Sequence, residues 1–229
     1  MPRIGTLELD PEITAVKETR ERREDGWHRQ ISVTGLAPLC APAAAREAFL
    51  DALWAAAAAD ETGSVTMSLR PGRAISARAL RLTRENLRTG GEGAFSALFE
   101  GLAPWEEAES PTTALWNIAS QGAETAVCSA GTLPAPLTLA FTAAGAVYYP
   151  SFSDGARTLV FPGSVAAGST LLVDGPLGRV TLDGADVTAL CSGSFPRIGP
   201  APGTTLLYVD DPDSAHTGVA SLSWRDRWV

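Results

Sequence analysis

Apolar and polar residues alternate along residues 27–34 with the period of two that is typical of a β-strand. One face of this predicted strand carries Trp27, Arg29, Ile31 and Val33. The preceding residues 17–25 alternate in the sign of their charge and contain no apolar side chain. This pattern predicts a solvated strand extension or a hairpin arm. The alternative is an arm that becomes ordered against a partner.

Residues 42–60, with bounds that are approximate, form the one segment with a helical pattern. Pro42 stands near its start, where a missing N–H costs nothing, and alanine, the best helix former, dominates the segment. Apolar residues recur at three- and four-residue spacing, which predicts one stripe against a core. The stripe consists of Ala45, Phe49, Ala52, Leu53 and Ala56. We expect Trp54, on the same helix, to be buried.

Strand-like segments follow at residues 64–72, 73–87 and 93–101. In the middle segment the apolar phase shifts between Ile75 and Leu80, which predicts a β-bulge. The first half is therefore expected to consist of several strands and one packed helix.

The second half has only strand patterns, separated by turns. Asp183 and Gly184 stand between apolar β-branched segments and predict a type I′ turn, which needs positive φ at both positions. Asp174, which a glycine and a proline follow, predicts another turn. The spacing of a calcium-binding loop is absent, so these aspartates are interpreted as turn residues. Short strands at such intervals are typical of a β-sandwich or barrel.

A long connection rich in glycine and proline spans residues 191–203. Such a connection must be held against a core, because ordering it otherwise costs backbone entropy with nothing in return. We expect Phe195 to pin it, Pro196 to fix the chain direction and Gly203 to supply the turn into the next strand.

The composition changes between the two halves. Residues 1–110 hold 13 basic and 17 acidic residues, whereas residues 111–229 hold 5 and 9. A chain of 229 residues with 45% hydrophobic content is long enough for two small domains, each with its own core. We predict a mainly β protein with two β-sandwich-like domains, at residues 1–110, with the packed helix, and at residues 111–229.

The overall charge and the apolar runs exclude some classes of protein. A net charge of −8 argues against a general nucleic-acid binder, which needs clustered basic residues. The longest apolar run, residues 49–59, contains a charge and is too short to span a bilayer. The first residues lack the basic and apolar regions of a signal peptide, so we expect synthesis and folding in a cytoplasm.

Residues that carry chemistry are few. The two histidines are His28 and His216, and no serine lies in a G-x-S-x-G motif. Cys40, Cys128 and Cys191 are far apart and lack the spacing of zinc ligands, so we expect reduced, mostly buried thiols.

Two acidic groups remain as candidates. The densest group is Glu106, Glu107 and Glu109. It is interpreted as a solvated linker between the domains. The second group is Asp210, Asp211, Asp213 and His216. It is interpreted as an exposed acidic loop, with weak cation binding as the alternative. We therefore predict no enzyme activity, no catalytic residue, no cofactor and no metal.

The order of several second-half motifs resembles the distal tail protein family of long-tailed bacteriophages, a siphophage-type component at the junction of tail tube and tail tip. The resemblance covers the last 100 residues or so well and the first half more loosely. It is carried by Ser129–Phe141, the step at Ala167–Asp174, the hairpin at Gly178–Leu190, and a signature at Phe195, Pro196, Ile198, Pro200 and Gly203. Thr204 or Thr205 replaces the asparagine that is usual in this signature, and an inserted Ala201-Pro202 lengthens its turn.

The resemblance implies a fold and a role. The second domain is expected to be a galectin-like β-sandwich, and the first a β-rich domain that forms a ring. Six copies are expected to join the tail tube to a hub or fibre protein in the virion, after assembly in the host cytoplasm. The expected partners are further copies of the chain, the tail tube protein and the hub or fibre protein, with the tape-measure protein as a further candidate.

The charged segment of residues 17–29 suits subunit contacts. The candidate interface residues are Arg20, Arg22, Arg23, Trp27 and Arg29. The competing function is a carbohydrate-binding or receptor-binding module of the tail tip, for which the six tryptophans, Trp224 and Trp228 among them, are the possible platforms. A small hydrolase is disfavoured by the missing motifs.

Overall fold

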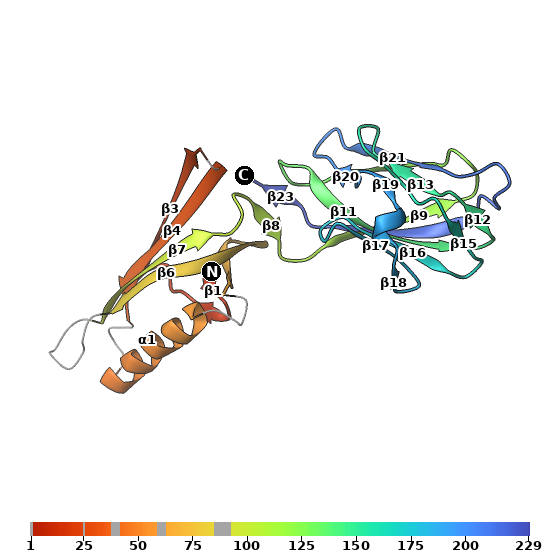
Figure 1. The fold of residues 1–229 in the computed structure, drawn as a ribbon. Coiled ribbons are helices and arrows are strands. Elements are labelled where there is room, and N and C mark those ends of the chain that lie inside the picture. Colours follow the sequence, from red (N-terminus) through yellow and green to blue (C-terminus); the bar gives the residue numbers. More distant parts are fainter. Residues whose placement is uncertain (1, 25, 38–41, 59–62, 85–92) are drawn as a thin grey trace. The chain divides into compact units, whose positions relative to one another are not determined.

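The computed structural model describes residues 2–24, 26–37, 42–58, 63–84 and 93–229. The chain divides into two compact units, Met1–Glu109 with Val229, and Ser110–Trp228. Strands dominate both units and one α-helix lies near the N-terminus, so the prediction of a mainly β fold is confirmed (Figure 1). The two units are described separately below.

The N-terminal unit is one antiparallel sheet with a helix on it. Its elements are β1 (Arg3–Ile4), β2 (Leu7–Glu8), β3 (Thr14–Arg23), β4 (Gly26–Leu36), α1 (Ala43–Ala57), β5 (Val65–Arg70), β6 (Arg73–Arg84), β7 (Ala94–Gly101) and β8 (Glu106–Ala108). The strands follow the order β2-β1-β5-β6-β7-β4-β3, and β8 also pairs with β6. Hydrogen bonding thus runs continuously from β2 to β3.

Helix α1 packs against β1, β2 and β6 and supplies part of the first core. Its buried residues are Leu50, Leu53 and Ala57, and the ring of Phe49 lies 5.9 Å from that of Phe95. The predicted stripe was therefore only partly right, because Ala45 and Ala52 are exposed.

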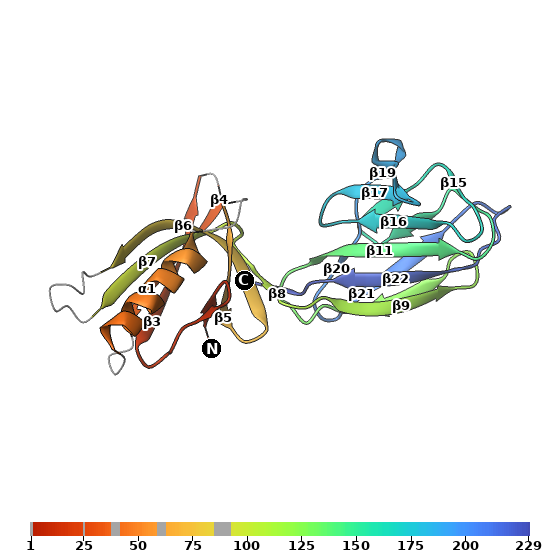
Figure 2. The same cartoon turned by 90° about the horizontal axis from the view of Figure 1, so that it is seen from below.

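Trp54 is 43% exposed, so the expectation that it is buried was wrong. A helix with apolar residues around most of its circumference does not reveal from sequence which side faces the core. In Figure 2, α1 lies across the sheet of its own unit.

The predicted bulge is present in β6. The pairing of β6 with β7 shifts its register between Ala79 and Arg81, within one residue of the predicted change of phase. The sheet therefore keeps Ile75 and Ala77 in the core on one side of the bulge, and Leu82 packs against that core on the other.

The C-terminal unit is a β-sandwich. Its elements are β9 (Thr112–Ile118), β10 (Glu124–Val127), β11 (Ala135–Ala143), β12 (Val147–Tyr148), β13 (Ser151–Ser153), β14 (Thr158–Val160), β15 (Ser164–Val165), β16 (Thr170–Asp174), β17 (Arg179–Leu182), β18 (Ala185–Asp186), the 3-10 helix η2 (Thr188–Leu190), β19 (Ser192–Gly193), β20 (Arg197–Ile198), β21 (Thr204–Val209), β22 (Gly218–Trp224) and β23 (Arg227–Trp228). One sheet has the order β10-β21-β13-β14-β19. The other has the order β18-β17-β16-β11-β22-β9, with β20 on β11.

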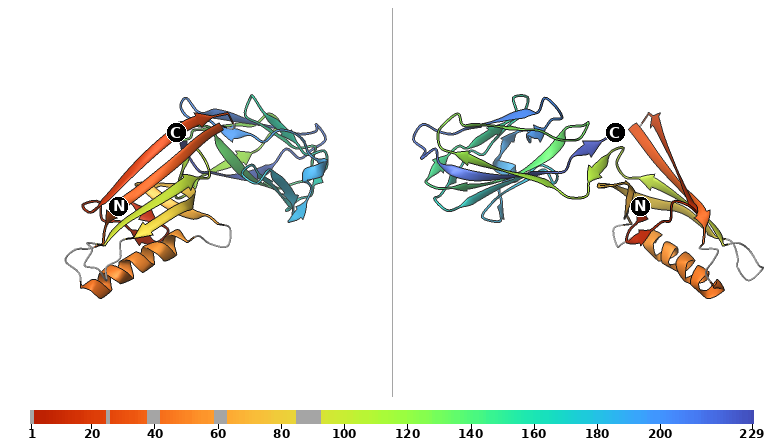
Figure 3. Two further views of the ribbon diagram at one scale, coloured as in Figure 1. Left: turned by 60° about the vertical axis from the view of Figure 1, so that its left-hand side comes forward. Right: turned by 180° about the vertical axis from the view of Figure 1, so that it is seen from behind.

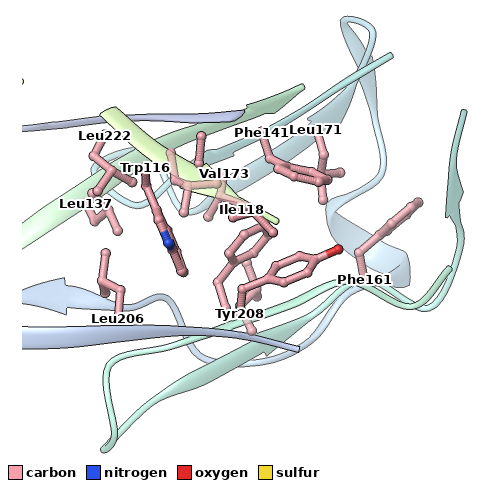
Figure 4. Close-up of a cluster of buried hydrophobic side chains, with 14 of the residues drawn as sticks. Trp116, Ile118, Leu137, Phe141, Phe161, Leu171, Val173, Leu206, Tyr208 and Leu222 are labelled. Carbon is pink, nitrogen blue, oxygen red and sulfur yellow. The ribbon is translucent and has the colours of Figure 1, made fainter. Parts of the chain in front are cut away.

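An aromatic centre joins the two sheets of the sandwich. Phe141 of β11 lies 5.8 Å from Phe152 of β13, ring centre to ring centre, and Phe152 lies 5.6 Å from Tyr208 of β21. Figure 4 shows Phe141, Trp116 and Leu222 from one sheet directed toward Tyr208 and Leu206 from the other. Trp116 and Trp224 are both buried in this core, which removes them as sugar-binding platforms.

The turns that the aspartates predicted are present. Asp183 and Gly184 have φ of 48° and 86°, and the flanking residues Leu182 and Ala185 pair across the turn. The Asp183 carboxylate also accepts the backbone N–H of Thr170 at 2.8 Å. Asp174 accepts the N–H of Leu177 at 3.1 Å and so closes the turn between β16 and β17.

The connection between β19 and β21 is held at several points. Ile198 is 0% exposed, Pro196 is buried, and Phe195 packs against the core while partly exposed. The Asp154 carboxylate accepts the backbone N–H of Arg197 at 2.8 Å. Ile198 and Asp154 thus hold the connection together with Phe195, which was the residue predicted to pin it.

Gly203 ends the connection in a conformation that favours glycine. Its φ is +104°, and a Cβ at this position would lie 2.7 Å from the carbonyl oxygen of Val127. A larger residue is therefore excluded by both the backbone conformation and the neighbouring strand.

We predict that Ile198→Ala destabilises the protein by about 2–5 kcal/mol, because it removes a fully buried side chain and leaves a cavity. Phe195→Ala should cost less, since part of the Phe195 ring is exposed. Leu177→Ala, in an exposed turn, is the control and should change stability little. Denaturant unfolding measures all three. A larger loss for Phe195→Ala than for Ile198→Ala would contradict this order.

Candidate functional site

The β3–β4 hairpin extends past the end of the sheet. β3 and β4 pair from Thr14 and Gly35 to Arg23 and Gly26, whereas β7 pairs with β4 only from Arg29 onward. We call the projecting part, Glu21–Arg23 with Gly26–His28, the arm. Figure 3 shows the two long strands of this hairpin beside β7. The prediction of a hairpin at this segment is confirmed.

The arm presents one basic and one aromatic side chain to solvent. Arg22 and Trp27 are directly opposite in the register of the hairpin, so their side chains lie on the same face. Both are exposed, Trp27 by 58%. Arginine and tryptophan are the residue types most often found at the energetic centres of protein interfaces. The arm therefore has the chemistry of a docking element.

The other candidate interface residues have different environments. Arg20 is partly buried and its Nε donates to Glu18 at 2.6 Å. Arg29 has a side chain that is 0% exposed, so its assignment to a contact surface was wrong. The side chain of Arg23 lies outside the described part of the structure.

Arg29 instead belongs to a partly buried ion cluster at the base of the arm. Its Nη2 donates to Glu18 Oε2 and to Glu106 Oε1, both at 2.8 Å. Arg70 also bonds to Glu106 Oε1. Arg73 Nη1 lies 3.7 Å from Glu106 Oε2. We call Glu18, Arg29, Arg70, Arg73 and Glu106 the Glu106 cluster.

Glu106 was expected in a solvated linker, and this interpretation was wrong. The Glu106 side chain is 2% exposed, and the strand that carries it, β8, pairs with β6 through Ala74 and Glu107. Glu109 of the same group forms an ion pair with Arg3 at 2.5 Å. An arginine on the core-facing side of a predicted strand was the available signal, because a buried guanidinium requires an acidic partner.

The arginines of this region change the pKa of Glu18. Burial raises the pKa of Glu18, but the hydrogen bonds and charges of Arg20 and Arg29 outweigh burial and hold this pKa below its ordinary value. Glu18 thus remains ionised in the fold at neutral pH. The cluster contains three arginines and two glutamates, so ionised acids are needed to limit the repulsion between the cations.

The acidic loop of the C-terminal unit has internal partners. The Asp210 carboxylate accepts the hydroxyl of Tyr208 at 2.6 Å and lies 2.6 Å from Nδ1 of His216. Asp211 accepts the backbone N–H of Asp213 at 3.0 Å, which is turn geometry. Among the residues that the structure describes, no group of three or more histidine, cysteine or acidic side chains is arranged to hold a metal.

The remaining chemical groups lie apart. His28 is on the arm, with Nδ1 3.7 Å from Glu100 of β7. Cys128 is exposed, contrary to expectation, and Cys191 is partly buried. Burial, with a contribution from the charge of Asp186, raises the pKa of the Cys191 thiol. Cys40 lies outside the described residues.

Within the described ranges, no helix is long and apolar enough to cross a membrane.

No family model matches the sequence, and no curated protein matches it. The crystal structure of SPP1 Dit (gp 19.1) matches with a TM-score of 0.66 and 12% sequence identity, over 100% of this chain and 92% of that one. The chain has the fold of that phage distal tail protein. SPP1 Dit is described as a paradigm of the hub adsorption apparatus in phages that infect Gram-positive hosts.

The match extends over both units, whereas the sequence resemblance was clear mainly in the second half. The prediction of a distal tail protein fold is therefore confirmed for the whole length. At 12% identity the likeness concerns the fold alone, so the role of each residue rests on the geometry given above.

We predict that Glu106→Gln destabilises the protein by up to about 3–5 kcal/mol, because it removes one of the two carboxylates that pair with buried Arg29. Glu12→Gln is the control, since Glu12 is exposed and should be within about 0.5 kcal/mol of wild type. Denaturant unfolding compares the two variants. Equal, small effects would show that Glu106 contributes nothing as an ion.

A second prediction concerns pH. A carboxylate with a lowered folded-state pKa contributes stability above its unfolded pKa of about 4.3 and loses that contribution as pH falls through the folded pKa. Wild type should therefore exceed Glu18→Gln in melting temperature at neutral pH, and the gap should narrow below about pH 4. A gap that stays constant during acidification would contradict the lowered pKa of Glu18.

Proposed function

We propose that the protein is a structural component of a phage tail, a ring of six copies that joins the tail tube to the hub or fibre at the tip. The likeness of the whole chain to SPP1 Dit carries this proposal. The protein would then reside in the virion, with assembly in the host cytoplasm. Its partners would be further copies of itself, the tail tube protein and the hub or fibre protein, with the tape-measure protein as a further candidate.

The exposed side chains of the arm also support the proposal. It is a projecting hairpin with exposed Arg22 and Trp27, fixed at its base by the Glu106 cluster. A rigid base lowers the entropy cost of ordering a docking element when it binds. We assign subunit contact to Arg22 and Trp27 and leave Arg29 with the structural role of an anchor.

We also propose that the second unit, residues 111–229, is a galectin-like domain. A sandwich with a closed aromatic core and pinned connections suits an architectural domain, and such a fold does not itself imply sugar binding. The prediction that the protein is not an enzyme follows from the same reading of the fold.

We predict that the protein within assembled tails has the mass of a hexamer, and that the purified protein approaches this mass as its concentration rises. Arg22→Glu with Trp27→Ala should shift purified protein toward monomer without a change in melting temperature, because both side chains are exposed. Arg179→Glu, which has the same charge change in the C-terminal unit, is the control. Light scattering over a concentration series measures the mass. A stable monomer inside assembled tails would exclude the ring.

A further inference from the structure

Helix α1 has few charged residues for a helix with one exposed side, and two of them, Glu47 and Asp51, lie on that side. Among its 15 residues, Ala43–Ala57, the charged ones are Arg46, Glu47 and Asp51. A surface helix of a monomer normally carries a polar face opposite its apolar stripe, and a helix that is apolar around most of its circumference is normally buried on all sides. The second side of α1 is therefore suited to being covered.

The uncovered side has a defined composition. We call it the outer face of α1, and it consists of the exposed residues Ala44, Glu47, Ala48, Asp51, Trp54 and Ala55. The alanines permit another chain to approach closely, and Trp54 offers a large apolar surface. Tryptophan is one of the residue types enriched at the energetic centres of interfaces.

A hollow adjoins this face where α1 meets the end of β6. It is lined by Asp51, Trp54, Ala55 and Arg84. Arg84 Nη1 lies 2.7 Å from Asp51 Oδ1, and both side chains are at least half exposed. The hollow therefore has the Trp54 side chain on one side and the Asp51 carboxylate on another. Arg84 pairs with this carboxylate but leaves it exposed enough to accept a second arginine.

The fold places the arm and the outer face at different parts of the sheet. The arm belongs to β3 and β4, at one edge of the order β2-β1-β5-β6-β7-β4-β3, and α1 packs against β1, β2 and β6. In Figure 1 the arm rises from one side of the N-terminal unit and α1 lies on the other. Two different patches on one copy are what a closed ring requires, because each copy must contact one neighbour with each patch.

We infer that the outer face of α1 is the docking surface for the arm of a second copy of this chain. The inference rests on the ring proposed above and assigns its two complementary patches. Arg22 of the neighbour meets the carboxylate of Asp51, and the neighbour's Trp27 enters the hollow beside Trp54. A guanidinium pairs with a carboxylate and stacks on an indole face, so one arginine serves both residues of the hollow.

Charge reversal at the two patches tests the pairing. Asp51→Arg and Arg22→Glu should each weaken self-association at least about tenfold, because each places like charges opposite one another. The double variant Asp51→Arg with Arg22→Glu should recover most of the association, since the charges are again opposite. Trp54→Ala should weaken association by far more than it lowers the melting temperature, because Trp54 is 43% exposed. Glu12→Gln serves as the neutral control.

Cross-linking adds a direct measure of proximity. Trp27→Cys combined with Ala55→Cys should form disulfides between copies under mild oxidation and yield covalent oligomers. Each single cysteine variant controls for the native thiols, of which Cys128 is exposed. The same pair is examined in assembled tails, so that a weak ring in isolation does not obscure the result.

The outcomes separate this inference from the proposed function. Suppose that wild type forms six-membered rings and that Trp54→Ala and Asp51→Arg form them equally well. The outer face of α1 is then not the docking surface, but the proposed ring is retained. If double reversal restores nothing and the cysteine pair does not cross-link in tails, the pairing of arm and helix is wrong. If tails contain only monomers of this chain, the proposed ring itself fails.

Discussion

The buried contact between Arg29 and Glu106 is the constraint on which the N-terminal unit depends. Arg29 lies in β4 and Glu106 in β8, 77 residues apart in the chain, and their side chains are 0% and 2% exposed. Glu18 of β3, Arg70 of β5 and Arg73 of β6 complete the cluster. One set of charges therefore ties together the hairpin that carries the arm, the neighbouring β5–β6 hairpin and the short strand that ends the unit.

Burying this ion pair has a large desolvation cost. Removing two ions from water costs several kcal/mol for each, and only good geometry with further hydrogen bonds offsets this cost. Within the described residues, Nε and Nη1 of Arg29 and Oε2 of Glu106 have no hydrogen-bond partner. Apolar side chains would hold the strands together at lower cost. A slip of register would leave a buried ion unpaired, so the charges favour the observed register of these strands.

Local patterns predicted the local structure well. Alternation located β4, the change of phase located the bulge in β6, and Asp183-Gly184 located a turn with two positive φ angles. These features depend on neighbours in the chain. The Glu106 cluster could not be predicted in the same way, because the partners of Glu106 lie far away in sequence. Its acidic neighbours and the proline-rich surroundings resembled a linker.

The prediction that Trp54 is buried failed for a related reason. An apolar residue on an alanine-rich helix satisfies both a core and an interface, and sequence alone does not say which of two apolar sides a single chain covers. Sequence likewise did not show which apolar residue of the 191–203 connection is buried most, and the structure buries Ile198 more completely than Phe195. Burial is decided by the number of layers that the fold supplies, and the N-terminal unit supplies one sheet for one helix.

The two units differ in the burial of their tryptophans. In the C-terminal unit Trp116 and Trp224 are buried between two sheets, and Asp226 there accepts the indole N–H of Trp224 at 3.0 Å. In the N-terminal unit Trp27 and Trp54 are both more than 40% exposed, one on the arm and one on the outer face of α1. A single sheet with a helix on one side offers no second layer to cover these residues. In the ring proposed above, contact between copies would supply that layer for these two tryptophans.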